Sequence, residues 1–313
     1  MPTQYSAHRP VVMGTQWMIT ADHPLAARAG AAILEAGGNA VDAAIGANLV
    51  MTVVRPHMCG LGGDLFALIY MAAESKFEAL NASGRAPAAA TLDVLRAKGH
   101  TVMPETGLLT ATVPGAIAGW QAALEKYGTM SLDRLLPKAI DYAQNGFPLY
   151  AELQDAMRDR RGFLKQSAAA AETFFPKGQL PEVGQRLIHP RLAESLKMLA
   201  ERGPDAFYRG PLGEALIALC ESDGGLIGPQ DLSEHTVTWH TPLKTTYRGY
   251  EVCTQPPNSQ GIALLMQANM LENFDLAETM KFGQAELVHL MVEAKKLAFA
   301  DRDKYVCDPD FHP

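Results

Sequence analysis

The sequence predicts an α+β protein in which helices form layers over paired strands. Two short apolar runs, 65–72 and 77–80, lie on either side of a polar break, and this pattern predicts a β-hairpin. Residues 40–54 are almost all apolar or small, which is typical of a helix buried on every side. Residues 243–255 repeat the hairpin pattern. A few paired strands among many helices favour a helix-over-sheet architecture.

The first elements follow from helix start and stop signals. Residues 11–20 predict a strand. Asp22-His23-Pro24 combines a short polar cap with a proline, which predicts the start of a helix. Gly37-Gly38 ends that helix, and Asn39 can cap the buried helix over 40–54.

The middle of the chain alternates capped helices with one irregular stretch. Thr91 caps a short helix that runs through Lys98, and Pro114 begins another. Pro137 either kinks the helix that follows Ser131 or divides it in two. Residues 165–190 predict a long surface loop, although they could also form a partner surface. Further helices are predicted at 190–202, 211–222 and 284–306.

The composition indicates a globular chain without general affinity for nucleic acid. The chain has 313 residues, of which 48% are hydrophobic and 19% charged, and its formal net charge is -7. No stretch approaches the ~18 consecutive apolar residues of a membrane span. We therefore expect one domain over residues 1–313, with no nucleic-acid or membrane partner. The first residues lack an apolar segment of signal-peptide length, so we expect a cytoplasmic protein.

No motif of a metal, cofactor or serine-nucleophile site is complete. The cluster Gly60–Gly63 precedes a strand and lacks the spacing of a dinucleotide fingerprint. Ser83 and Ser259 lack the first glycine of a nucleophile elbow. The histidines form no H-E-x-x-H pair, and the cysteines form no C-x-x-C pair. We expect neither a metal nor a cofactor. The cysteines are Cys59, Cys220, Cys253 and Cys307.

Arg85 is the best candidate for binding a ligand. It lies in the segment N-A-S-G-R-A-P, at the far end of the second strand of the first hairpin. A guanidinium is always charged and offers a planar fork to a carboxylate. The small neighbours Ser83 and Gly84 would leave a ligand room to approach it. The residues alone leave two alternatives open, an anion-binding site and a structural ion pair with an Asp or Glu elsewhere.

Several long segments carry a family resemblance. These segments are DHPLAARAGAAILEAGGNAVDAAIGANLV, PHMCGLGGDLFALIY, NASGRAP, AFYRGPLGEALIAL, PPNSQGIALLMQANMLENFDL and HLMVEAKKLAFADRDKYVCDPDF. In order and over nearly its whole length, the chain resembles the large-subunit half of the γ-glutamyltranspeptidase family of N-terminal-nucleophile hydrolases. That resemblance implies a four-layer αββα sandwich, to which this chain contributes the large-subunit part.

The resemblance also implies where the catalytic groups lie. In this family a precursor cuts itself in front of a threonine, whose hydroxyl becomes the nucleophile and whose freed α-amine is the base. That threonine begins the small subunit, so we expect no catalytic residue on this chain. The chain resembles a large subunit without its flexible tail, and its expected partner is the small subunit of the same precursor.

One departure from the family pattern concerns the substrate. The true transpeptidases carry an arginine three positions before Ala-Pro, in an F-R-E-x-A-P context, where it binds the glutamyl α-carboxylate. Ser83 occupies that position here, and the arginine stands at Arg85, directly before Ala86-Pro87. Two residues of extended chain span about 6.6 Å, enough to misplace a bidentate clamp. The segments N-A-S-G-R-A-P and P-P-N-S-Q-G look more like the branch that contains acylases and oxamate hydrolases.

The expected activity is therefore hydrolysis of a small carboxylate-bearing amide, such as an oxamate-like amide, through a threonyl acyl-enzyme. Arg85 and Ser83 are the residues we expect to bind the acidic end of that amide. One alternative is true γ-glutamyl transfer with glutathione hydrolysis. A second is a homologue that binds a small molecule but catalyses nothing, because a fold does not guarantee a reaction.

Overall fold

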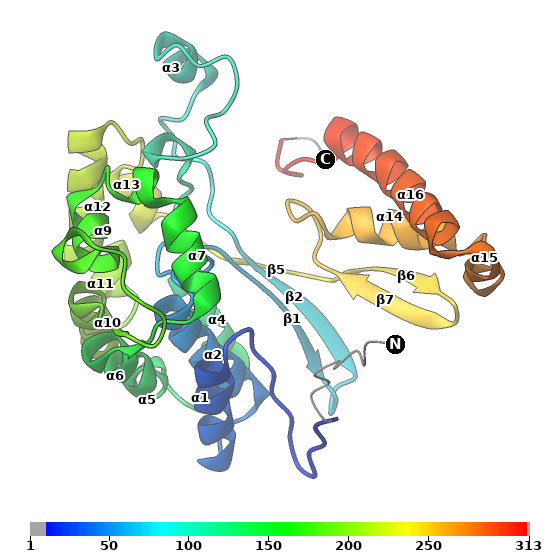
Figure 1. Cartoon of the computed structure of the whole chain (residues 1–313), viewed down its shortest axis with the longest axis horizontal. Coiled ribbons are helices and arrows are strands. Elements are labelled where there is room, and N and C mark those ends of the chain that lie inside the picture. The colour runs from blue at the N-terminus through cyan, green and yellow to red at the C-terminus, as the bar shows by residue number, and fades with distance from the viewer. Residues whose placement is uncertain (1–10, 312–313) are drawn as a thin grey trace, which may run out of the picture. The chain divides into compact units, whose positions relative to one another are not determined.

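The structure is a computed structural model that describes residues 11–311, and its internal contacts divide the chain into two compact units (Figure 1). The first unit contains residues 11–61 and 124–206. The second contains residues 62–123 and 207–311. The prediction that residues 1–313 form one domain stays a prediction. No described helix is both long enough and apolar enough to cross a bilayer.

The first unit is built on two helices that begin where their caps predict. Helix α1 (Pro24–Glu35) starts after His23, whose Nδ1 accepts a hydrogen bond from the backbone N–H of Leu25. Helix α2 (Ala40–Val54) starts with a capping box in which Asn39 and Asp42 satisfy each other's backbone N–H groups. Almost the whole length of α2 is buried, and it packs against α1 and α6. The prediction of a buried helix over 40–54 is confirmed.

Other predictions for the first unit hold less well. Residues 11–20 contain no assigned strand, and 15–21 make no backbone–backbone hydrogen bond with another described residue. One of the two alternatives predicted for Pro137 is confirmed, because it divides its segment into two helices. The loop predicted over 165–190 contains a helix and a short strand, and Phe175 within it is buried. The elements are α5 (Leu132–Leu135), α6 (Pro137–Asn145), β3 (Phe147–Pro148), α7 (Ala151–Asp159), α8 (Arg161–Leu164), α9 (Ala168–Phe174), η2 (Pro176–Gly178), β4 (Arg186–Leu187) and α10 (Pro190–Arg202).

The second unit is organised around the first predicted hairpin. Strands β1 (Leu65–Met71) and β2 (Lys76–Ala82) pair antiparallel, and Leu65 lies opposite Ala82 at the open end. A third strand, β5 (Thr238–His240), pairs with β2 on its other edge (Figure 1). The sequence did not predict β5, because its three residues carry too little periodicity.

The second predicted hairpin is also present. Strand β6 (Leu243–Tyr247) pairs with β7 (Tyr250–Thr254), helix α14 (Gly261–Leu271) packs beside them, and helix α16 (Gln284–Tyr305) packs against α14 (Figure 1). The other elements of this unit include most of α4 (Ala116–Tyr127), together with α3 (Leu92–Ala97), η1 (Leu108–Thr110), α11 (Asp205–Tyr208), α12 (Pro211–Asp223), α13 (Pro229–Ser233) and α15 (Leu276–Phe282).

Candidate functional site

The loop after β2, which carries the predicted site residues, is held tightly against the open end of the hairpin. The backbone N–H of Gly84 donates to Asp64 Oδ1 at 3.0 Å, and the N–H of Val113 donates to the carbonyl of Arg85 at 2.9 Å. A Cβ on Gly84 would lie 1.6 Å from the carbonyl oxygen of Val113, so only glycine fits there. Asp64 therefore fixes the backbone of this loop through its carboxylate.

A second carboxylate holds the same loop four residues further on, at Ala88. Asp231, in α13, accepts the backbone N–H of Ala88 on Oδ1 at 2.9 Å and that of Gly228 on Oδ2 at 2.8 Å. The loop is thus anchored at Gly84, Arg85 and Ala88 by groups from three other segments. A site on such a braced loop is preorganised, since few of its backbone torsions remain to be fixed on binding.

Arg85 projects from this rigid backbone into solvent. Its side chain is exposed, and within residues 11–311 it forms no ion pair and no side-chain hydrogen bond. The nearby Asp64 carboxylate binds the backbone N–H of Gly84 instead. The described part of the chain therefore contains no structural ion pair that would occupy this guanidinium.

Ser83 lies in a short chain of hydrogen-bonded side chains from two segments. Asn81 Oδ1 accepts the backbone N–H of Ser83 at 3.0 Å, and Asn81 Nδ2 donates to Asn258 Oδ1 at 2.8 Å. Asn258 Nδ2 donates in turn to Ser83 Oγ at 2.7 Å. The structure thus brings N-A-S-G-R-A-P and P-P-N-S-Q-G together, two segments that the sequence analysis noted separately.

Gln255 fixes the segment P-P-N-S-Q-G beside the hairpin. It is buried, and its Nε2 donates to the carbonyls of Ala67 at 2.7 Å and Leu80 at 2.9 Å. The backbone carbonyl of Gln255 accepts a hydrogen bond from the hydroxyl of Ser259 at 3.1 Å. One glutamine side chain therefore ties β1, β2 and the end of β7 together, which sets the position of Asn258.

His235 lies beside the candidate site, and sequence reasoning missed it. Its ring stacks on Tyr208 with 5.5 Å between centroids, and the Tyr208 hydroxyl donates to Pro114 O at 2.8 Å. Its Nε2 is buried without a hydrogen-bond partner in the described residues, and a Cβ on Gly115 would lie 3.2 Å from it. Burial and the positive charge of Arg85 lower the pKa of His235, and Asp64 partly offsets them. No local pattern around His235 marks it as near Arg85.

This arrangement can bind an anion but supplies no activated nucleophile. It offers an exposed guanidinium and a serine hydroxyl on a fixed backbone, both suited to a carboxylate. Burial raises the pKa of the Cys59 thiol, which keeps the thiol protonated. Within the described residues no three His, Cys, Asp or Glu side chains are grouped as a metal would require.

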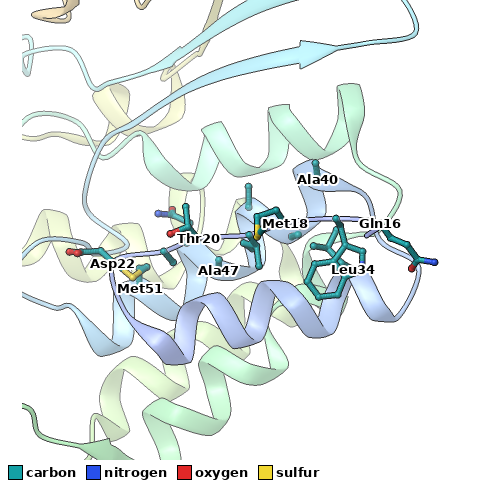
Figure 2. A pocket seen from close by; sticks show the side chains of 14 residues that line it. Gln16, Met18, Thr20, Asp22, Leu34, Ala40, Ala47 and Met51 are labelled. Atoms are coloured by element: carbon teal, nitrogen blue, oxygen red, sulfur yellow. The ribbon is translucent and has the colours of Figure 1, made fainter. Parts of the chain in front are cut away.

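A separate groove of about 620 Å³ lies in the first unit. One face of α2, including Ala40, Ala47 and Met51, forms one side (Figure 2). The segment 16–22 forms another and contributes Met18 and Thr20 (Figure 2). The groove is lined mainly by small and apolar side chains and holds no cluster suited to catalysis.

Comparison with known families gives one consistent match. The family model described as Gamma-glutamyltranspeptidase matches residues 26–313. The chain is 40% identical over 301 residues to the Glutathione hydrolase-like YwrD proenzyme of Bacillus subtilis, covering 96% of this chain and 57% of that protein. It is 36% identical over 317 residues to the Acylase ACY 1 proenzyme of Pseudomonas sp. (strain V22), covering 98% and 56%.

A third curated relative and a crystal structure agree with this match. The chain is 36% identical over 303 residues to the Oxamate amidohydrolase proenzyme of Klebsiella pneumoniae, covering 95% of this chain and 56% of that protein. The crystal structure of Helicobacter pylori gamma-glutamyltranspeptidase superposes with a TM-score of 0.90 at 33% identity, covering 96% of this chain and 87% of that one. The chain spans little more than half the length of the curated relatives it matches.

Proposed function

The chain belongs to the gamma-glutamyltranspeptidase family, and from this premise we propose that it is the large-subunit part of a self-processing amide hydrolase. Three relatives with 36% to 40% identity carry the word proenzyme in their names, which supports processing of a longer precursor. In this proposal the partner of the chain is the small subunit cut from the same precursor.

The proposed chemistry needs a single threonine, at the start of the small subunit. Its hydroxyl attacks the substrate carbonyl while its own α-amine accepts the hydroxyl proton. The C–N bond then breaks, and the leaving amine takes up that proton. Water attacks the resulting ester, releases the carboxylic acid and restores the threonine. The residues of this chain do not enter the bond changes, and their proposed work is to bind and orient the substrate.

One observation carries the proposed substrate class. Arg85 is exposed and unpaired within the described residues, on a loop whose backbone is braced by Asp64 and Asp231. Ser83 lies two residues away with its hydroxyl held by Asn258. A fixed cation beside a fixed hydroxyl suits the carboxylate of a small acidic amide. The names of the relatives do not decide between acyl groups, because the compared hydrolases have similar identities to this chain.

Exposed apolar faces in the second unit support the proposed partner subunit. The outward side chains of β1 are large and apolar, with Phe66 40%, Leu68 41% and Tyr70 59% exposed. On α16, Val288 is 56% and Met291 50% exposed, three residues apart and so on one helical face. Contiguous apolar patches of this kind are typical of surfaces that another polypeptide covers.

The test uses the product of the complete gene. We expect it to split into two fragments and the smaller to begin with threonine, which N-terminal sequencing would identify. We then expect hydrolysis of oxamate or glutaryl-p-nitroanilide at a rate that an added dipeptide does not change. An unprocessed product that binds such amides without cleaving them would favour the non-catalytic homologue.

True γ-glutamyl transfer is the second candidate, because the curated relative with 40% identity is named glutathione hydrolase-like. Turnover of γ-glutamyl-p-nitroanilide with and without glycylglycine separates the two. Fast turnover that glycylglycine accelerates, together with no hydrolysis of the simpler acidic amides, would favour transfer and contradict the first proposal.

A further inference from the structure

The backbone of Ser83 determines how three neighbouring side chains are oriented. The N–H of Ser83 can only donate, so the atom of Asn81 that faces it must be the acceptor Oδ1. The Nδ2 of Asn81 then faces Asn258 and requires its Oδ1 there. Asn258 is left with its Nδ2 directed at Ser83 Oγ. Each amide orientation therefore follows from the one before it.

The last hydrogen bond in this series, from Asn258 to Ser83, determines where the Ser83 hydroxyl can direct its hydrogen. Because Ser83 Oγ accepts a hydrogen bond from Asn258 Nδ2 at 2.7 Å, its own hydrogen is directed elsewhere. No described residue accepts that hydrogen. The guanidinium of Arg85, two residues along the same braced loop, has donors only. A ligand that reaches both side chains therefore meets a hydrogen donor on each, although the Ser83 oxygen keeps one free lone pair.

We infer that Asn258 is a positioning residue that makes this site selective for a carboxylate over a carboxamide or an ammonium group. A carboxylate accepts hydrogen bonds and donates none, so it satisfies both Ser83 and Arg85. A carboxamide is uncharged and has a single acceptor oxygen for the two donors, and an ammonium group has no acceptor and is repelled by the guanidinium. The identity of the substrate rests on the function proposed above, whereas the binding preference can be tested without turnover.

The decisive variant is Asn258→Asp in the complete gene product. The new side chain has nearly the same shape and still accepts from Asn81, but it cannot donate to Ser83. The Ser83 hydroxyl would instead donate to the introduced carboxylate, and so its hydrogen would turn away from the ligand. Because that carboxylate also repels anions, Ser83→Ala and the double variant are needed to separate the two effects.

The first readout is binding of oxalate and glutarate, measured by calorimetry on the processed protein. We expect Ser83→Ala to weaken binding of the better probe about tenfold, the value of one charge-assisted hydrogen bond. Asn258→Asp should weaken it about a hundredfold in the natural protein but only about tenfold in the Ser83→Ala background. An effect of equal size in both backgrounds would mean that Asn258 acts by charge alone, which would overturn the inference.

The second readout is the choice between oxamate and its uncharged counterpart oxamide. We expect the ratio of kcat/KM for the two to fall in Asn258→Asp, through KM for oxamate, while oxamide changes little. Gln179→Glu is the matched control, since it makes the same amide-to-carboxylate change on an exposed side chain of the first unit. Equal losses for oxamate and oxamide would indicate a merely structural role and would also overturn the inference.

The two proposals can fail separately. If the protein hydrolyses no amide but binds oxalate or glutarate with the pattern above, the proposed function is wrong and the role of Asn258 stands. If it hydrolyses acidic amides while Ser83→Ala and Asn258→Asp leave KM and anion binding unchanged, the role of Asn258 is wrong and the proposed function stands.

Discussion

Arg85 is an arginine on a fixed backbone with no counterion among the described residues. We predict that Arg85→Ala raises KM for a carboxylated amide by ~10- to 150-fold, because a hydrogen bond to a charged group contributes about 1.5–3 kcal/mol. Arg85→Lys should restore only part of the lost affinity for the carboxylated amide, since an ammonium lacks the planar fork. Steady-state kinetics on oxamate and oxamide would measure both effects.

Arg96 supplies the control for this prediction. It is exposed on α3, in the same unit, and replacing it with alanine removes the same charge away from the loop after β2. We expect Arg96→Ala to leave KM unchanged. Equal increases for Arg85→Ala and Arg96→Ala would mean that only the general field of the surface matters, and Arg85 would then have no specific role.

The ionisation of His235 should make anion binding depend on pH. Burial and the charge of Arg85 hold its pKa below the ordinary 6.5, so the ring is neutral at neutral pH. Below that pKa the ring gains a positive charge near Arg85, with Asp64 and Tyr208 as its other ionisable neighbours. A carboxylate should therefore bind a few-fold more tightly as the pH falls through the pKa. By linkage, a bound carboxylate should raise that pKa.

The inhibition constant of oxalate between pH 7.5 and 5 is the appropriate measurement, because it does not involve the catalytic amine. We expect the increase in affinity at low pH in the natural protein and its absence in His235→Asn. An identical pH profile in His235→Asn would assign the effect to another group.

At the scale of the secondary-structure elements, Asp42 joins the start of α2 to the segment after α4 within the first unit. It is fully buried, and its carboxylate accepts hydrogen bonds from Asn39 N at 2.8 Å, Thr129 N at 2.9 Å, Thr129 Oγ1 at 2.6 Å and Met130 N at 3.1 Å. Burial raises the pKa of Asp42, but these hydrogen bonds outweigh burial and leave it lowered. The carboxylate is therefore charged and well satisfied in the folded state.

We predict that Asp42→Asn lowers the free energy of unfolding by about 2–4 kcal/mol, because an amide directs an N–H at a group that can only donate. Urea denaturation would measure it. Asp93→Asn, in the first turn of the exposed helix α3, should change stability by less than about 1 kcal/mol. A loss no larger for Asp42 than for Asp93 would contradict the prediction.

His189 makes the stability of the first unit depend on pH. It precedes α10, is 4% exposed and lies against the rings of Phe147 and Phe174. Burial lowers its pKa from 6.5 to about 4. His189 therefore binds a proton near pH 6.5 in the unfolded chain but only near pH 4 in the folded protein.

The contribution of His189 to the free energy of unfolding should thus be fully present above pH 6.5. It should fall by roughly 3 kcal/mol as the pH drops towards 4. Urea unfolding across this range would show the slope. His189→Leu should flatten it, because leucine cannot be protonated. If the slope were unchanged in His189→Leu, other groups would account for the acid sensitivity.

The elements that the sequence predicted are those with local signals. Caps and glycine stops gave α1 and α2, and two apolar runs gave the β1–β2 hairpin. The elements it missed depend on distant partners. Strand β5 exists because Trp239 pairs with Leu80, and β3 because Phe147 pairs with Leu187. Two or three residues cannot show a period of their own, so no local pattern predicts such strands.

At the scale of the whole molecule, the fold class predicted from the family resemblance is confirmed. The match to a solved gamma-glutamyltranspeptidase covers 96% of the chain with a TM-score of 0.90. The residues grouped at the candidate site could be selected from the sequence only in part. Arg85 and Ser83 could be selected from one short segment, whereas Asn258 and His235 reach them through folding across 150 or more residues. Nothing in their local sequence marks that proximity.

The segment 15–21 carries the last prediction. Its backbone has no hydrogen-bonded neighbour among the described residues, although its composition predicted a strand. An extended chain with an unpaired edge is a template for strand addition. Under the proposed function, the small subunit supplies the missing strand. We therefore expect the amides of residues 16–20 to be protected from hydrogen exchange in the processed protein.

The comparison within the same sample is residues 101–106, which also lack backbone hydrogen bonds among the described residues and lie in an exposed loop. Their amides should exchange within seconds, while those of 16–20 should exchange orders of magnitude more slowly if a ladder forms. Fast exchange in both segments would mean that no strand pairs with 16–20. The partner would then have to bind through the apolar faces of β1 and α16 alone.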